Sequence, residues 1–177
     1  RRRPGVFEGL VRVVCAQQLS SASAGAIWGR LRAAYEPFDH HSLGRAHAAK
    51  LQRVGLSAAK VRTVKALARA VAQGAVDFGA LAAMAADAAH AVLTAVHGVG
   101  PWTADVYLLF CLGHPDAWPA GDLALQEAAR LAFGLPRRPT AKEMADIAEA
   151  WRPWRGVAAR LLWSYYRAVK RRDPAPA

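Results

Sequence analysis

The chain has 177 residues, a length that suits one domain or two closely packed lobes. Hydrophobic residues make up 54% of it, which is enough for a buried core and excludes an intrinsically disordered chain. The net charge of +11 is compatible with a polyanionic partner such as nucleic acid, and equally with an inert basic surface.

The composition also narrows the fold and the compartment. The 41 Ala against 2 Ile and 4 Thr argue against an all-β fold, because alanine favours helices and β-branched residues favour strands. No run of about 18 apolar residues is unbroken, so we expect no membrane partner. Cys15 and Cys111 form no disulfide framework, which indicates a reducing compartment, and we expect a cytoplasmic protein. The sequence offers no Cys and His set for a zinc or iron–sulfur site.

Helix start and stop signals recur along the chain. In the first half of the chain they predict helices from Ser20 to about Tyr35, from Ser42 towards Arg53 and from Ser57 to Gly74, with Asp77 and Asp87 as further N-caps. In the second half they predict helices from Pro101 to about Leu112, from Asp122 to Gly134 and from about Pro153 to Arg171. Thr140 and Glu143 form a capping box that predicts one more helix start. We predict an all-α domain of eight to ten short helices over residues 1–172, followed by a disordered tail at 173–177.

One segment, at about residues 88–112, predicts a helical hairpin. Gly98 and Gly100 allow positive φ angles and close approach of another molecule, and the helix that starts at Pro101 presents free N–H groups to the turn. This pattern is typical of a helix–hairpin–helix that binds the DNA backbone. An ordinary αα-hairpin also favours glycine, so the pattern alone leaves both interpretations open.

A lone carboxylate, Asp122, opens a helix 22 residues after Gly100. The simplest interpretation is an N-cap. The same position suits chemistry, because a helix N-terminus stabilises an ionised carboxylate that can in turn stabilise a sugar cation or orient a water. The two roles are compatible with each other.

Taken together, these motifs resemble the helix–hairpin–helix DNA glycosylases, in which a hairpin is followed by a catalytic Asp. The stretches 7–20, 100–104 and 151–155, followed by Ala158 and Trp163, are similar to further family motifs in the expected order, and resemble the branch of 3-methyladenine DNA glycosylase II. The resemblance implies two helical lobes with the active-site cleft between them, and a compact form of the family.

The resemblance also implies the reaction. Bifunctional members carry a Lys nucleophile where this chain has Trp102, and iron–sulfur members carry four cysteines near the C-terminus, where this chain has none after Cys111. We therefore expect a monofunctional hydrolase for base excision repair. It would flip an alkylated purine out of double-stranded DNA and hydrolyse its N-glycosidic bond, with Asp122 as the catalytic residue.

The expected base pocket is aromatic. Trp102 could stack on a cationic alkylated base, and the resemblance adds Trp163 on the last helix. Tyr107 and Trp28 are looser candidates, for which core packing is the alternative. Gln18, in the loop before Ser20, is the candidate wedge for the gap that a flipped base leaves, with a solvated loop as the alternative.

The remaining expectations concern DNA contacts. The expected contact residues are His97, Gly98, Val99, Gly100, Thr103 and Arg155. Lys60, Arg62, Lys65 and Arg69 are expected to add distributed phosphate contacts. The resemblance further implies a monovalent cation held by hairpin carbonyls, here those of Thr94, Val96 or Val99.

Other functions stay open at this point. The same fold could act on uracil, hypoxanthine or an oxidised purine, or it could be a non-catalytic DNA-damage binding module. An Ala-rich helical scaffold without a DNA partner would leave the ordered motifs unexplained. We expect a monomer that needs no organic cofactor and, as a glycosylase of this kind, a bacterial, nucleoid-associated protein.

Overall fold

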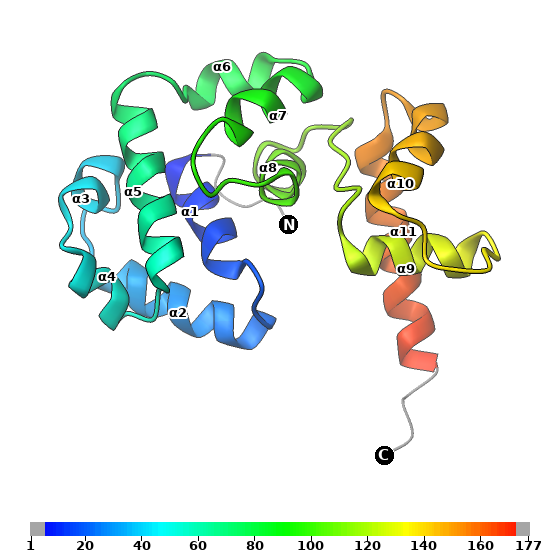
Figure 1. Ribbon diagram of the computed structural model, residues 1–177, viewed down its shortest axis with the longest axis horizontal. Coiled ribbons are helices and arrows are strands. Elements are labelled where there is room, and N and C mark those ends of the chain that lie inside the picture. The colour runs from blue at the N-terminus through cyan, green and yellow to red at the C-terminus, as the bar shows by residue number, and fades with distance from the viewer. Residues whose placement is uncertain (1–5, 173–177) are drawn as a thin grey trace. The chain divides into compact units, whose positions relative to one another are not determined.

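The computed structural model describes residues 6–172, so the expected tail at 173–177 lies outside the described residues. The described residues form helices and no strand, which confirms the all-helical prediction. The chain divides into two compact units, Arg1–Gly113 and His114–Ala177, which we call the N-terminal and C-terminal units (Figure 1).

The N-terminal unit contains eight α-helices and one π-helical turn among its described residues. They are α1 (Phe7–Ala16), α2 (Ser21–Ala33), α3 (His40–Arg45), α4 (Ala48–Arg53), α5 (Ala58–Ala72), α6 (Phe78–Ala83), α7 (Ala86–Thr94), α8 (Pro101–Tyr107) and η1 (Leu108–Leu112).

Helix α1 is the centre of this unit. It packs against α2, α5 and α8, and Figure 1 shows it between α5 and α8. Its side chains Leu10, Val11, Val13 and Val14 are fully buried. A helix that is apolar almost all round is buried by neighbours on several sides, which is why three helices surround α1.

Most predicted caps are confirmed. The side chains of Ser20, Ser57, Asp77 and Thr140 each accept a main-chain N–H at a helix start, and Thr140 forms the full capping box with Glu143. Pro101 occupies the first turn of α8, as predicted.

Two predicted caps are wrong. Asp39 rather than Ser42 caps α3, because its carboxylate accepts the N–H of Ser42 at 2.7 Å and the helix begins at His40. The chain then becomes extended at Ala46, so two short helices replace the single predicted one. Asp87 lies inside the first turn of α7, whose cap position is Ala85.

The C-terminal unit contains α9 (Leu123–Ala132), α10 (Ala141–Ala148), the 3₁₀ turn η2 (Glu149–Trp151) and α11 (Arg155–Arg172). Helix α9 packs along α11, and η2 contacts both α10 and α11. The indole N–H of Trp118 donates to the carbonyl of Met144 at 3.0 Å, and its ring meets Trp151 edge-on at 5.4 Å. These contacts join the loop before α9 to the middle of α10 and to η2.

Among the described helices, none combines the length and apolar character that crossing a bilayer requires.

Candidate active site and DNA-binding hairpin

The predicted hairpin is present in the N-terminal unit, with α7 and α8 joined by a turn. Gly98 has φ +81°, and a Cβ built there would collide with the Thr63 hydroxyl of α5 and lie 2.9 Å from the Thr63 Cβ. Gly98 is therefore required by the fold itself. Gly100 differs, because its φ is −86° and an added Cβ would meet no atom within 4 Å. Nothing inside the described protein requires a glycine at that position.

The hairpin is held by a residue that the sequence analysis missed, Gln17. Its side-chain amide donates to the carbonyl of Gly98 at 3.2 Å and to the hydroxyl of Thr103 at 2.8 Å. The loop after α1 thus fixes both the turn and the first turn of α8. Thr103 is only 2% exposed, so its predicted role as a DNA contact is corrected for the side chain: the buried hydroxyl already has Gln17 as its partner.

The loop after α1 also carries the candidate wedge. Gln18 is exposed and has φ +54°, which makes it the non-glycine residue with left-handed backbone in the described chain. Lys60 donates to the carbonyls of Cys15 and Gln17, both at 2.9 Å, and so caps the end of α1. Partial burial lowers the pKa of Lys60, and its predicted phosphate contact is replaced by this capping role.

The other hairpin residues divide by exposure. His97 and Gly98 are exposed on the turn, while the Val99 side chain is 4% exposed and its N–H donates to the carbonyl of Val96 at 3.0 Å. The side chain of Val99 therefore belongs to the core.

The three aromatic candidates of the N-terminal unit differ in how deeply they are buried. Trp102, the second residue of α8, is half-buried. Tyr107 is fully buried against Phe78, with ring centroids 6.1 Å apart, so core packing replaces the predicted pocket role. Trp28 is half-buried and packs edge-on against Phe38 at 5.3 Å, with the Arg12 guanidinium 5.8 Å from its ring.

In the C-terminal unit, the carboxylate of Asp122 accepts hydrogen bonds from two different helices, α9 and α11. It is the N-cap of α9, where its Oδ1 accepts the N–H of Leu125 at 2.8 Å. The same oxygen accepts the indole N–H of Trp163, on α11, at 3.1 Å. The structure therefore brings Asp122 and Trp163 together, and a fixed, half-buried carboxylate of this kind is suited to stabilise a developing positive charge.

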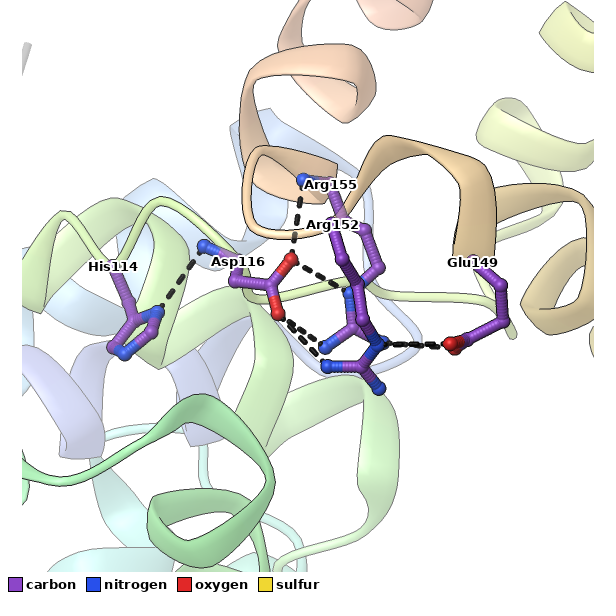
Figure 2. A network of polar contacts seen from close by, with 5 residues as sticks. All are labelled: His114, Asp116, Glu149, Arg152 and Arg155. Atoms are coloured by element: carbon purple, nitrogen blue, oxygen red, sulfur yellow. Dashed lines mark hydrogen bonds and ion pairs between the residues drawn. The ribbon is translucent and has the colours of Figure 1, made fainter.

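The prediction that Arg155 contacts DNA is corrected, because the structure uses its guanidinium in an internal ion pair. Its guanidinium binds both carboxylate oxygens of Asp116 at 2.8 Å, and its main-chain N–H donates to the same carboxylate at 3.3 Å (Figure 2). The side chains of Arg155 and Asp116 are 8% and 10% exposed. A bidentate pair at this depth is a strong, geometrically specific interaction, and it leaves Arg155 little surface for DNA.

The network around this pair ties the loop before Asp122 to the start of α11. Arg152 binds Asp116 at 2.9 Å and Glu149 at 2.9 Å, and the N–H of Asp116 donates to Nδ1 of His114 at 3.2 Å (Figure 2). Burial alone would raise the pKa of Asp116, but hydrogen bonds from Arg155 and the charges of Arg155 and Arg152 together lower it.

Within the described residues, no three His, Cys, Asp or Glu side chains gather as a metal site would require.

Residues 11–153 match the HhH-GPD superfamily of base excision DNA repair proteins. The chain belongs to this superfamily. The motifs that predicted it, the hairpin and the stretch around Asp122, lie inside the matched residues.

Curated relatives carry related names. A Mycobacterium tuberculosis protein named probable bifunctional transcriptional activator/DNA repair enzyme AlkA is 36% identical over 167 residues, which cover 89% of this chain and 33% of the relative. DNA-3-methyladenine glycosylase 1 of Schizosaccharomyces pombe is 31% identical over 161 residues, covering 89% of this chain and 71% of the relative. The chain spans 57% of a Bacillus subtilis relative named DNA-3-methyladenine glycosylase, so two of these three relatives are much longer.

Solved structures show the same fold. The DNA-3-methyladenine glycosidase of Bacillus halodurans aligns with a TM-score of 0.84 at 29% identity, covering 96% of this chain and 79% of that one. The 3-methyladenine DNA glycosylase of Schizosaccharomyces pombe, solved in complex with abasic DNA, aligns with a TM-score of 0.80 at 28% identity, covering 89% and 78%.

Proposed function

We propose that this protein is a monofunctional DNA N-glycosylase that removes alkylated purines, of the 3-methyladenine type, in base excision repair. The observation that carries the proposal is Asp122, a carboxylate held by a helix N-terminus and by the Trp163 indole. Its place in a chain of the HhH-GPD superfamily, with relatives named for 3-methyladenine, supports the substrate class.

The proposed reaction is hydrolysis. As the bond between the purine and the sugar breaks, positive charge develops on the sugar, and the Asp122 carboxylate stabilises it. Water then adds to the anomeric carbon, its oxygen forming the new bond while one proton is released. The products are a free base and an abasic site. Because Leu125 and Trp163 both bind Oδ1, the carboxylate needs little reorientation during the reaction.

Trp102 is the proposed stacking partner of the flipped base. An alkylated purine is cationic, and an indole face contributes a cation–π attraction of about 0.5–2 kcal/mol. Trp102 stands where bifunctional relatives carry the lysine nucleophile, so no Schiff base and no lyase step are proposed. The weakened glycosidic bond of the damaged base supplies the rest of the discrimination.

Double-stranded DNA with a damaged base is the proposed partner, bound through the exposed turn at His97 and Gly98 and through Gly100. We propose that the protein acts as a monomer on chromosomal DNA, which implies a cytoplasmic, nucleoid-associated enzyme. Gln18, exposed and left-handed, is the proposed wedge.

A monovalent cation is a further proposal at the hairpin. The carbonyls of Thr94, Val96 and Val99 lie in or beside a turn that the Val99 to Val96 hydrogen bond and Gln17 hold in place. Main-chain carbonyl oxygens are typical ligands for such ions. The ion would supply positive charge for a DNA phosphate.

The proposal is tested by a panel of duplexes, each with one lesion. We expect release of free 3-methyladenine, and much slower or no release of uracil, hypoxanthine or an oxidised purine. Borohydride should trap no covalent complex with DNA, because no lysine nucleophile is proposed. Binding to damaged DNA without any base release would instead identify a binding module, and preference for another lesion would correct the substrate.

The two glycines of the hairpin predict separable effects. Gly98→Ala should lower the free energy of unfolding by about 2–4 kcal/mol, because a left-handed alanine is strained and its Cβ collides with Thr63.

Gly100→Ala should change the free energy of unfolding by less than about 1 kcal/mol, yet weaken duplex binding about fivefold to tenfold, because the new methyl group lies where DNA would approach. Chemical denaturation and fluorescence anisotropy measure the two effects. Unchanged DNA affinity of Gly100→Ala would contradict the proposed contact.

A further inference from the structure

A basic groove lies on the N-terminal unit between α3 and α5. It has a volume of about 270 Å³, and its charged or polar lining residues are His40, His41, Arg45, Lys65 and Arg69. Cations of α3 and of α5 line this groove, and no acidic side chain of the described chain lines it. We call it the α3–α5 groove.

Small residues form the contact between the two helices. A Cβ built on Gly44 would lie 3.4 Å from the Cβ of Ala68, so α3 and α5 approach each other closely there. Lys65 donates to the carbonyl of Gly44 at 3.2 Å, which ties its side chain across the same contact. The groove is therefore a fixed feature of the packing.

Two of the cations lack a counter-charge. Arg45 and Arg69 are exposed, and no carboxylate of the described residues forms an ion pair with either. The acid that interacts with the histidines is Asp39, whose carboxylate caps α3 through Ser42 and does not line the groove. Close cations without a partner repel one another, and a bound anion relieves that repulsion.

The groove is continuous with the hairpin. Arg69 also lines a second hollow, of about 410 Å³, whose other lining residues include Gln73, Val96 and His97. His97 is an exposed residue of the hairpin turn, and Thr63, on the same helix as Arg69, lies against Gly98. Arg69 thus lines both the α3–α5 groove and the hollow beside the hairpin turn.

We propose that the α3–α5 groove binds a backbone phosphate of the duplex that the hairpin binds, as a second contact away from the lesion. The inference rests on the proposed function for the identity of the polyanion. Duplex DNA carries one charge per 1.7 Å of its axis, so a basic groove that adjoins the hollow beside the hairpin can meet a further phosphate of the same molecule. A small anion that binds alone would not require the groove to adjoin the hollow beside the hairpin, whereas a duplex would.

The test compares the parent with Arg45→Ala/Arg69→Ala on undamaged duplexes of about one and about two helical turns, ~10 and ~21 base pairs. On the longer duplex we expect about tenfold weaker binding and a salt dependence whose logarithmic slope is shallower by about 1–2. On the shorter duplex, bound at the hairpin, the two proteins should have equal affinity. Both arginines are exposed, so the variant should melt at the same temperature as the parent.

The matched control is Lys142→Ala, which removes one exposed positive charge from α10 in the C-terminal unit. It should leave affinity for the longer duplex within about twofold of the parent. Equal loss on both duplexes, or no loss on the longer one, would overturn the second contact. Binding of polyglutamate that the variant loses while its DNA affinity stays unchanged would assign the groove to an acidic protein and also overturn the proposal.

Base release from the short duplex separates this inference from the proposed function. Release of 3-methyladenine from that duplex by the parent protein tests the proposed activity by itself, whatever the groove binds. Absence of base release by the parent would refute the proposed activity and leave the binding comparison intact.

Discussion

Replacing Asp122 by Asn is expected to lower the single-turnover rate of base release from alkylated duplex DNA at least about 100-fold, with the protein still folded. A positively charged sugar develops as the bond breaks, and a neutral amide gives it no counter-charge. Asn is a good N-cap, and its side-chain oxygen can accept the N–H groups of Leu125 and Trp163 as the carboxylate does. The loss should therefore fall on the chemical step.

The control for this variant is Asp146→Asn, because Asp146 is an exposed carboxylate of the same unit, paired with Lys142 at 3.0 Å. Each protein is measured for melting temperature, affinity for abasic duplex, and base release with enzyme in excess. A rate for Asp122→Asn within about tenfold of the parent would remove Asp122 from the mechanism. A lower melting temperature with an unchanged rate of base release would show that Asp122 acts only as the N-cap of α9.

The helices were largely predictable because their signals are local. Ser20, Ser57 and Thr140 each bind an N–H three residues ahead, so the sequence around each one contains the whole interaction. Asp39 and Ser42 show where this fails. The sequence analysis named Ser42 as the cap, but Asp39, three residues earlier, is the cap that forms, and its carboxylate accepts the N–H of Ser42.

The candidate site was predictable only in part. Asp122 was found because its cap and its distance from the hairpin are both visible in the sequence. Its bond to Trp163 joins residues 41 apart, and no periodicity reports such a contact. The family resemblance placed Trp163 at the base pocket, but it did not predict this hydrogen bond to Asp122. The catalytic role of Asp122 stays a prediction until base release is measured.

Long-range polar contacts account for the corrected residues. Arg155 was assigned to DNA because a basic side chain at a helix start suits phosphate, but its partner Asp116 lies 39 residues earlier. Thr103 was assigned to DNA from the hairpin motif, but Gln17, 86 residues earlier, takes its hydroxyl. In both cases a buried polar group has found an internal partner, which sequence spacing does not reveal.

The second large effect is expected at the Asp116 and Arg155 pair. Asp116→Ala should lower the free energy of unfolding by about 3–5 kcal/mol, because it leaves the buried Arg155 without its carboxylate. Replacing both residues, as Asp116→Leu/Arg155→Met, should restore most of that stability, because no unpaired charge is then buried. Chemical denaturation at pH ~7 measures both variants, with Asp146→Asn, expected within about 0.5 kcal/mol of the parent, as the exposed control.

The same pair predicts how stability depends on pH. The pKa of Asp116 is lowered in the folded protein, so its contribution is fully present above the ordinary carboxyl pKa of about 3.9 and is lost as the pH falls towards the lowered folded value. The difference in unfolding free energy between the parent and Asp116→Asn should therefore shrink below pH ~4. A difference that stays constant over that range would show that the carboxylate charge is not what stabilises the start of α11. Because this network also holds the loop that leads to Asp122, loss of the charge should slow base release as well, by less than Asp122→Asn does.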